Sequence, residues 1–376
     1  MEKESKVDVR DVIIKYLQKR WNINKAKGNL AQVRFTEIVY EKESRKKHYH
    51  QGCWLLAPQK GDYYRKRVAV FVHDRIEPKD TQLKDIINSQ MGTVASYFKN
   101  AGIQTIYAIP TYSYAQEGFL KKLESIRNSK NINDKLQKIF EENLSWELYV
   151  FDQESDHSWT KVIPKVFFQC WPTGGRPSKS RQEWDKDITH QYQELSQYTL
   201  LKLALHEAFY SGLIKTQLKL KIHDPYDVDG FVIAKDTNVI PLEMKEKTPA
   251  CDNSLKQKYF GIDAGRILML LLLVIPNNGN ALYIVREMKE NKNANKREFV
   301  KWKYTTLSDI ILSSSWNLQG GGRGMTGGKT QTVKIPYPIF KDLDFDLVFS
   351  DNFSIGSMPG ELKHELEKML NDPQDT

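Results

Sequence analysis

The chain has 376 residues, of which 40% are hydrophobic, 27% charged and 11% aromatic. This length and composition allow two compact units, or one core with a large elaboration, without stabilisation by disulfides. Three scattered cysteines, Cys53, Cys170 and Cys251, exclude a disulfide framework and a Cys-rich zinc site. The formal charge of +9 favours an anionic partner, because Lys and Arg gain free energy from the counterions released at phosphates.

The first ten residues, MEKESKVDVR, are charged and lack the apolar centre of a signal peptide. The most apolar run, residues 266–276, is about half as long as a bilayer-spanning helix. We therefore expect a cytoplasmic protein with no membrane segment. We also expect residues 266–276 to form a buried strand.

The N-terminal part of the sequence predicts an α/β region. Apolar spacing indicates an opening helix, two strands, a β-α-β unit, a charged helix and a further strand, at 7–21, 33–40, 52–57, 67–111, 116–143 and 145–152. Within the β-α-β unit, strands 67–74 and 103–111 are expected to be parallel neighbours joined by a helix at 81–100. We assign residues 1–150 to recognition or regulation.

The C-terminal part, residues 151–376, predicts a second region. Its expected elements are a helix at 187–211, strands at 216–223, 227–235 and 238–247, a short helix at 254–266 and the apolar strand that follows. A hairpin is expected beyond them, over residues 281–304. The order over residues 187–276 is therefore helix, three strands, helix, strand.

Residues 224–247 place acids and a lysine inside otherwise apolar strands, where bare charge is costly. Strand alternation puts Glu243 and Lys245 on one face, with Leu242 and Met244 on the other. If the strands on either side of residues 236–238 pair through that turn, Asp229 lies near Glu243. Two carboxylates beside a lysine form an oxygen-rich site suited to Mg²⁺.

Phosphodiester hydrolysis needs these parts. A magnesium ion held by Asp229 and Glu243 would neutralise phosphate charge and acidify a bound water, and the Met244 carbonyl is a further candidate ligand. Lys245 would orient the water and stabilise the pentavalent phosphorus. Glu207, on the preceding helix, would act as another ligand or through a water.

Asp229, the run Glu243-Met244-Lys245 and Glu207 on the preceding helix resemble the PD-(D/E)XK nuclease superfamily, and most closely its type II restriction endonucleases. The resemblance covers residues 187–276 and implies a restriction-endonuclease-like α/β core of helix, three strands, helix and strand. It also implies metal ligation by Asp229 and Glu243 and catalysis by Lys245, with a less secure role for Glu207. The proline of the motif does not directly precede Asp229, so Asp227, close to Pro225, remains a rival ligand.

Basic residues in two turn-rich segments are candidate DNA contacts. These residues are Arg176, Lys179 and Arg181 in PTGGRPSKSR, together with Arg323 and Lys329 in and after the glycine-rich run 320–328. The first segment fits a solvated basic loop equally well, and the second lacks the order of a nucleotide-binding P-loop.

Several residues also have simpler interpretations. Glu243 and Lys245 would suit the solvated face of an edge strand, and Glu207 an ordinary polar position of an amphipathic helix. Asp263 and Arg266, three apart on an expected helix, indicate a local ion pair, although Arg266 also suits a phosphate.

The sequence as a whole predicts a magnesium-dependent endonuclease for double-stranded DNA, acting as a sequence-specific restriction homodimer in which two copies of one site cut both strands. One alternative keeps the catalytic core for repair, recombination or ligand-activated defence. The other alternative is a non-catalytic DNA-binding protein whose acids only stabilise the fold.

Overall fold

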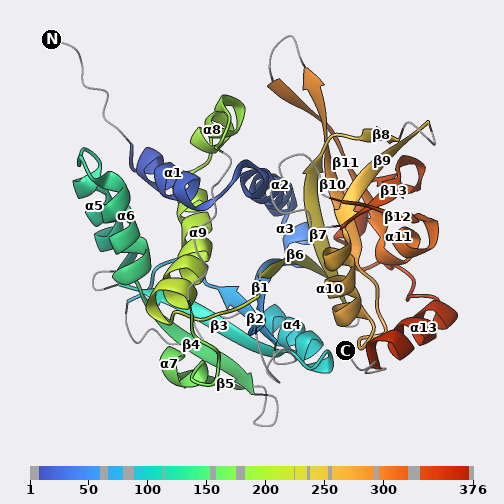
Figure 1. The fold of residues 1–376 in the computed structure, drawn as a ribbon, viewed down its shortest axis with the longest axis horizontal. Helices are drawn as coiled ribbons and strands as arrows, with labels where there is room; N and C mark the ends of the chain where they lie inside the picture. Colours follow the sequence, from blue (N-terminus) through green and yellow to red (C-terminus); the bar gives the residue numbers. More distant parts are fainter. Residues whose placement is uncertain are drawn as a thin grey trace. The chain divides into compact units, whose positions relative to one another are not determined.

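The computed structural model describes residues 8–59, 67–78, 89–112, 115–152, 158–174, 183–223, 225–234, 238–252, 256–291, 296–320 and 331–371 (Figure 1). The protein is mixed α/β and forms two compact units. The first unit comprises Met1–Leu30, Cys53–Ala95 and Ile103–Pro225, and the second comprises Ala31–Gly52, Ser96–Gly102 and Tyr226–Thr376. The units therefore interleave along the sequence, whereas the sequence predicts consecutive regions divided at residue 150.

The first unit combines strands in the order β1-β2-β3-β4-β5 with several helices. Its helices are α1 (Val9–Arg20), the start of α2 (Ile23–Tyr40), most of α4 (Ser89–Asn100), α5 (Ala115–Ile126), α6 (Ile132–Gln137), η3 (Lys138–Glu142), α7 (Pro164–Phe167), α8 (Lys186–Gln193), α9 (Gln197–Ala208) and η4 (Phe209–Gln217). Its strands are the end of β1 (Tyr49–Leu56), β2 (Val68–Val72), β3 (Gln104–Thr111), β4 (Ser145–Asp152) and β5 (Ser158–Val162).

The β-α-β unit expected in this region is confirmed, because β2 and β3 are parallel and helix α4 lies between them in the chain. The strand expected at residues 33–40 is wrong, since these residues complete helix α2. Ala31, Phe35 and Val39 are four residues apart and all fully buried, so they form one apolar stripe of a helix.

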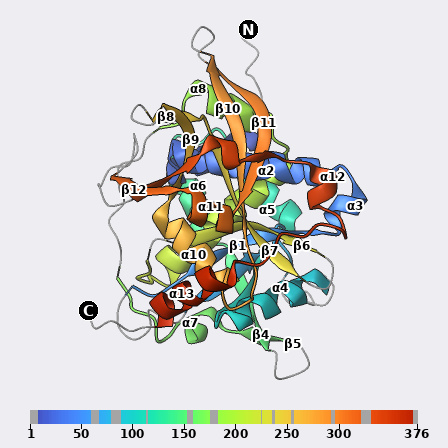
Figure 2. The same cartoon turned by 90° about the vertical axis from the view of Figure 1, so that its right-hand side faces the viewer.

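The second unit contains the strand order β14-β11-β10-β7-β6-β1 and a small sheet in the order β12-β13-β9-β8. Figure 2 labels β9, β10 and β11 of this unit together with α10, α11 and α13. Its strands are the start of β1, β6 (Tyr226–Ile233), β7 (Val239–Lys247), β8 (Ala250–Asp252), β9 (Gln257–Asp263), β10 (Leu282–Asn291), β11 (Lys296–Thr306), β12 (Ser315–Gly320), β13 (Gln331–Pro336) and β14 (Lys341–Asp342). Its helices are the ends of α2 and α4, α3 (Glu43–Lys46), α10 (Ala264–Val274), α11 (Leu307–Ser313), η6 (Tyr337–Ile339), α12 (Phe345–Val348) and α13 (Gly360–Asn371). The expected hairpin is confirmed by antiparallel β10 and β11.

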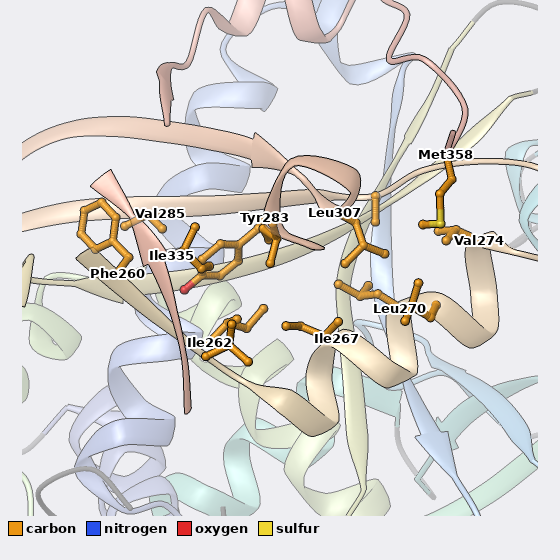
Figure 3. Close-up of a cluster of buried hydrophobic side chains, with 14 of the residues drawn as sticks. Phe260, Ile262, Ile267, Leu270, Val274, Tyr283, Val285, Leu307, Ile335 and Met358 are labelled. Carbon is orange, nitrogen blue, oxygen red and sulfur yellow. The ribbon is translucent and has the colours of Figure 1, made fainter. Parts of the chain in front are cut away.

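Two hydrophobic clusters cover the faces of the larger sheet in this unit. Leu282 and Ile284 of β10 belong to a cluster with residues of α2, β6 and β7. Tyr283 and Val285 belong to another cluster, with residues of α10, α11, β9 and β13 (Figure 3). Because alternate strand residues face opposite sides, each face of the sheet has its own core.

Three predictions for residues 216–276 are wrong. The apolar run forms helix α10 instead of a strand, and residues 257–263 form strand β9 instead of a helix. Residues 216–223 lie at and after the end of η4, where Leu220 and Ile222 make only isolated bridges. Within the described ranges, no helix, α10 included, is long and apolar enough to cross a membrane.

Helix α10 has a clear start and an apolar face. The Asp263 side chain accepts a hydrogen bond from the Gly265 N–H, which caps the first turn. Ile267, Leu271 and Val274 recur at helical spacing and are buried in the cluster of Figure 3, whereas Leu268 is exposed. One face of α10 is therefore buried at helical spacing. This spacing cannot be recognised in the sequence, because nearly every residue of the short run is apolar.

We expect Leu271→Ala to lower the free energy of unfolding by about 2 to 5 kcal/mol, because it leaves a cavity in this cluster. Leu268→Ala removes the same atoms from an exposed position of the same helix and should change it by less than about 0.5 kcal/mol. Urea unfolding of both variants measures the difference. Equal losses would contradict the orientation of α10.

Candidate functional site

Strands β6 and β7 bring Asp229 and Glu243 together. The strands are antiparallel, and their pairing includes Gly230 opposite Leu242, one residue from Asp229 and Glu243. Both carboxylates are buried, with exposed fractions of 4% and 1%. Leu242 and Met244 pack in the cluster on the α2 side. The predicted division of β7 into a charged face and a core face is confirmed.

Two N–H donors fix the carboxylate of Asp229. The Met244 main-chain N–H donates to Oδ2 over 2.5 Å, and the Gln32 side chain donates to Oδ1 over 2.5 Å. A Cβ added to Gly52 would lie 1.9 Å from the Val228 carbonyl oxygen, which shows that strand β1 approaches β6 closely. Gln32 was missed by sequence reasoning, since no local pattern links it to a strand so far along the chain.

Lys245 neutralises part of this buried charge. Its Nζ lies 2.6 Å from Glu243 Oε1 and 3.8 Å from Asp229 Oδ2. Burial raises the pKa of Asp229 well above its usual range, and Lys245 opposes that rise. Burial disfavours the charged form of Lys245, but Glu243 and Asp229 outweigh it and raise the Lys245 pKa. The two strands thus hold a lysine between two acids.

Arg266, in the first turn of α10, joins the same group. Its Nη2 lies 2.5 Å from Asp227 Oδ1, and its Nη1 donates to the Asp227 carbonyl over 2.7 Å. Its Nη1 also lies 3.5 Å from Glu243 Oε2. The expected local pair with Asp263 is wrong, because Asp263 caps the helix and Arg266 contacts Asp227 and Glu243 instead.

The donors suit a small divalent cation. Asp229 and Glu243 supply buried carboxylate oxygens from neighbouring strands. Magnesium is commonly held by one or two carboxylates, with waters and substrate phosphate completing its shell. Among the residues that the structure describes, no group of three or more His, Cys, Asp or Glu side chains is arranged to hold a metal. A magnesium ion here would therefore depend on two protein carboxylates.

Glu207 belongs to the first unit and is fully engaged there. Its Oε2 accepts hydrogen bonds from Trp21 Nε1 at 2.6 Å and Lys25 Nζ at 2.7 Å, and its Oε1 accepts one from the Ser211 hydroxyl. Burial raises the Glu207 pKa, but these partners, Lys25 foremost, lower it below its usual range overall. These contacts hold the Glu207 carboxylate within the first unit.

The basic residues expected to contact DNA lie outside the described residues. They are Arg176, Lys179, Arg181, Arg323 and Lys329. The turn at residues 236–238, through which β6 was expected to reach β7, is described only at Asn238.

Comparisons with known protein families, with curated proteins and with solved structures found no match. The resemblance to PD-(D/E)XK nucleases therefore rests on the residues of this chain alone.

We expect Glu207→Gln to lower the free energy of unfolding at pH 7 by about 2 kcal/mol, because Lys25 and Trp21 lose a charged acceptor. The folded-state pKa of Glu207 is lowered, so its contribution is complete above the unfolded-state pKa of about 4.3. It is lost as the pH falls through the lower folded-state value. Urea unfolding of parent and variant should show a difference that shrinks below about pH 4.3. A difference independent of pH would contradict the ion pair.

Proposed function

We propose that the protein is a magnesium-dependent endonuclease that hydrolyses phosphodiester bonds of double-stranded DNA. The single observation that carries the proposal is the buried group of Asp229, Glu243 and Lys245 on β6 and β7. Burial of two acids is costly, and a fold with only a structural need could fill these positions with apolar side chains. Binding of a metal and a phosphate would account for the burial of these charged side chains.

The element order of the second unit supports the proposal. We assign α2, β1, β6, β7, α10 and β10 of this unit to a helix, three strands, a helix and a strand; α3, the end of α4, β8 and β9 lie between them in the chain as additions. Strands β6 and β7 are antiparallel, and β7 and β10 are parallel. In this assignment α2 and β1 take the places that the sequence predicts for residues 187–223.

The chemistry follows from the positions of the side chains. Asp229 and Glu243 would hold the magnesium ion, which supplies charge neutralisation and an acidified water when bound. Gln32 and the Met244 N–H hold Asp229 in one orientation. Lys245, 26% exposed, lies at the edge of the buried group, where its ammonium group can reach the phosphate and its attacking water.

Charge supports an anionic substrate, since the chain carries a formal net charge of +9. A restriction enzyme that recognises a short sequence and acts as a homodimer in the cytoplasm is our first assignment. A nuclease of repair, recombination or ligand-activated defence uses the same site, and mapping cleavage sites on random DNA distinguishes the two. A short recurring palindrome supports restriction, while cleavage without a consensus favours the alternative.

We expect Asp229→Ala and Lys245→Ala each to reduce cleavage of a magnesium-supplemented plasmid at least about a hundredfold. Asp229→Ala should still bind duplex DNA, because it removes a negative charge that repels phosphates. Lys245→Ala should bind slightly more weakly, because it removes a positive one. Cleavage and gel-shift assays on the same duplex measure both properties, and thermal melts control for folding.

Metal identity and one neighbouring acid provide the controls for these variants. Manganese should support cleavage and calcium should not, because calcium occupies oxygen sites without the geometry that the reaction needs. Asp227→Ala should retain reduced but measurable cleavage. Full activity in chelator, or parent-like cleavage by both Asp229→Ala and Lys245→Ala, would rule out this site as the nuclease centre. Duplex binding by the parent without any magnesium-dependent cleavage would instead leave the non-catalytic DNA-binding alternative.

Binding of DNA should depend steeply on salt. A protein that makes several phosphate contacts releases their counterions, so the affinity should fall at least about a hundredfold between about 50 and 200 mM salt. Fluorescence anisotropy of a labelled duplex in calcium measures binding without cleavage. A flat salt dependence would count against nucleic acid as the partner.

A further inference from the structure

Arg266 connects two acids of the site in a way that the proposed chemistry does not use. It makes two contacts with Asp227, one to the carboxylate and one to the main-chain carbonyl. Its third contact is the 3.5 Å approach of Nη1 to Glu243 Oε2. The guanidinium also lies 5.3 Å from the centre of the Tyr226 ring. Asp227 therefore holds Arg266 firmly, while the contact with Glu243 is longer and easier to give up.

Both oxygens of Glu243 face a cation in this structure. Lys245 Nζ lies at Oε1 and the Arg266 guanidinium lies at Oε2. A divalent cation at Glu243 would compete with these two positive groups and would be repelled by any that stayed nearby. Lys245 has a flexible stem, whereas Arg266 is held by Asp227. Of the two groups, Arg266 is therefore the one that stays close to Glu243 after its contact with the carboxylate is lost.

We propose that Asp227 and Arg266 form a positioning pair that weakens divalent-cation binding until a phosphate is present. This inference rests on the proposed function of the site. Once displaced from Glu243, the guanidinium stays beside the site through its two contacts with Asp227. It is then placed to bind a phosphate oxygen, which is a preferred partner of arginine. Phosphate binding neutralises the charge of the Arg266 guanidinium, and this favours binding of the divalent cation.

The pair couples the two ligands reciprocally. If DNA tightens cation binding by some factor, the cation must tighten DNA binding by the same factor. The role of Asp227 also follows: it acts through Arg266, which explains an acid at this position without making it a metal ligand.

The test is calorimetric titration of the full chain with Ca²⁺, with and without a saturating DNA duplex. Calcium serves as the probe because it should bind without cleaving the DNA. In the parent, DNA should tighten calcium binding about fivefold or more. In Arg266→Gln, calcium should bind more tightly than in the parent without DNA, and the effect of DNA should shrink. Arg266→Lys keeps a charge and should lie between the two.

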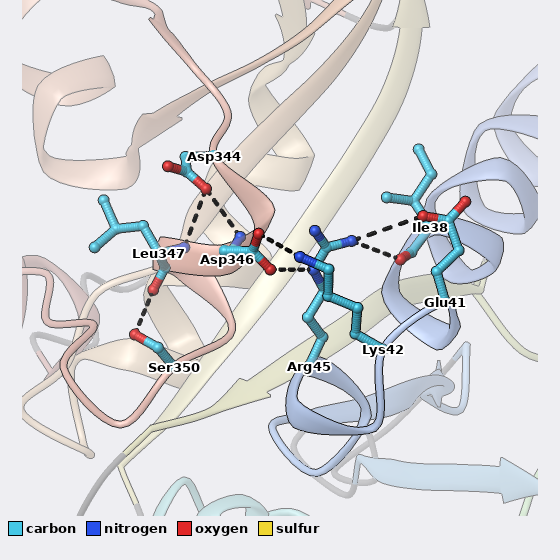
Figure 4. A network of polar contacts seen from close by, with 8 residues as sticks. All are labelled: Ile38, Glu41, Lys42, Arg45, Asp344, Asp346, Leu347 and Ser350. Atoms are coloured by element: carbon cyan, nitrogen blue, oxygen red, sulfur yellow. Dashed lines mark hydrogen bonds and ion pairs between the residues drawn. The ribbon is translucent and has the colours of Figure 1, made fainter.

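Asp227→Asn should have the opposite effect on calcium affinity, because it removes a negative charge from the site. If the pair only stabilised the fold, Arg266→Gln and Asp227→Asn would lower the calcium affinity by the same factor. The matched control is Arg45→Gln. Arg45 contacts the Asp346 carboxylate at 2.7 Å and the Ile38 carbonyl at 3.0 Å, which is a similar arrangement that involves none of the site residues (Figure 4). This control should leave calcium binding unchanged.

The outcomes separate this proposal from the nuclease assignment. Tighter calcium binding in Arg266→Gln together with an absence of magnesium-dependent cleavage would keep the positioning pair and discard the nuclease. Cleavage by the parent with calcium affinity unchanged or weaker in Arg266→Gln, in a variant that melts normally, would discard the pair and keep the nuclease. No calcium binding by the parent, with or without DNA, would overturn the pair as well.

Discussion

The pairing of β6 with β7 is the constraint on which the site depends. Because Gly230 lies opposite Leu242, Asp229 comes beside Glu243 and accepts a hydrogen bond from the Met244 N–H. A shift of one residue in this register would point Glu243 and Lys245 towards the apolar cluster. It would also point the apolar residues of β7 towards the site. Apolar burial on one face and buried charge on the other therefore specify the same register.

Local sequence patterns predict which side chains of β7 carry charge, but they do not predict the elements around this strand. The alternation of Glu243 and Lys245 with Leu242 and Met244 is a property of nine consecutive residues, so the sequence predicts their faces directly. Helix α10 was mistaken for a strand, because an eleven-residue apolar run satisfies both interpretations. The hydrogen bond between Asp263 and Gly265 marks its start, but an Asp also precedes many strands and turns.

Contacts between distant parts of the chain could not be predicted from the sequence. The sequence predicts Glu207 at the site because its helix precedes β6, whereas its hydrogen-bond partners Trp21 and Lys25 lie 186 and 182 residues earlier in the chain. Gln32 reaches Asp229 over a comparable separation. Helical periodicity identifies which residues of a helix are buried, but it does not specify the strands against which they pack. That choice depends on the whole fold.

The interleaving of the two units has a consequence for synthesis of the chain. The part of β1 that belongs to the second unit precedes residues 57–225, whereas β6, its neighbour in the sheet, follows them. Translation at roughly 5–20 residues per second separates β1 from β6 by on the order of ten seconds. The long separation between β1 and β6 lowers the equilibrium stability only slightly, because the entropy cost of closing a loop rises slowly with its length. During that interval, however, the nascent chain carries a strand edge without its partner, and an unpaired edge can pair with other chains.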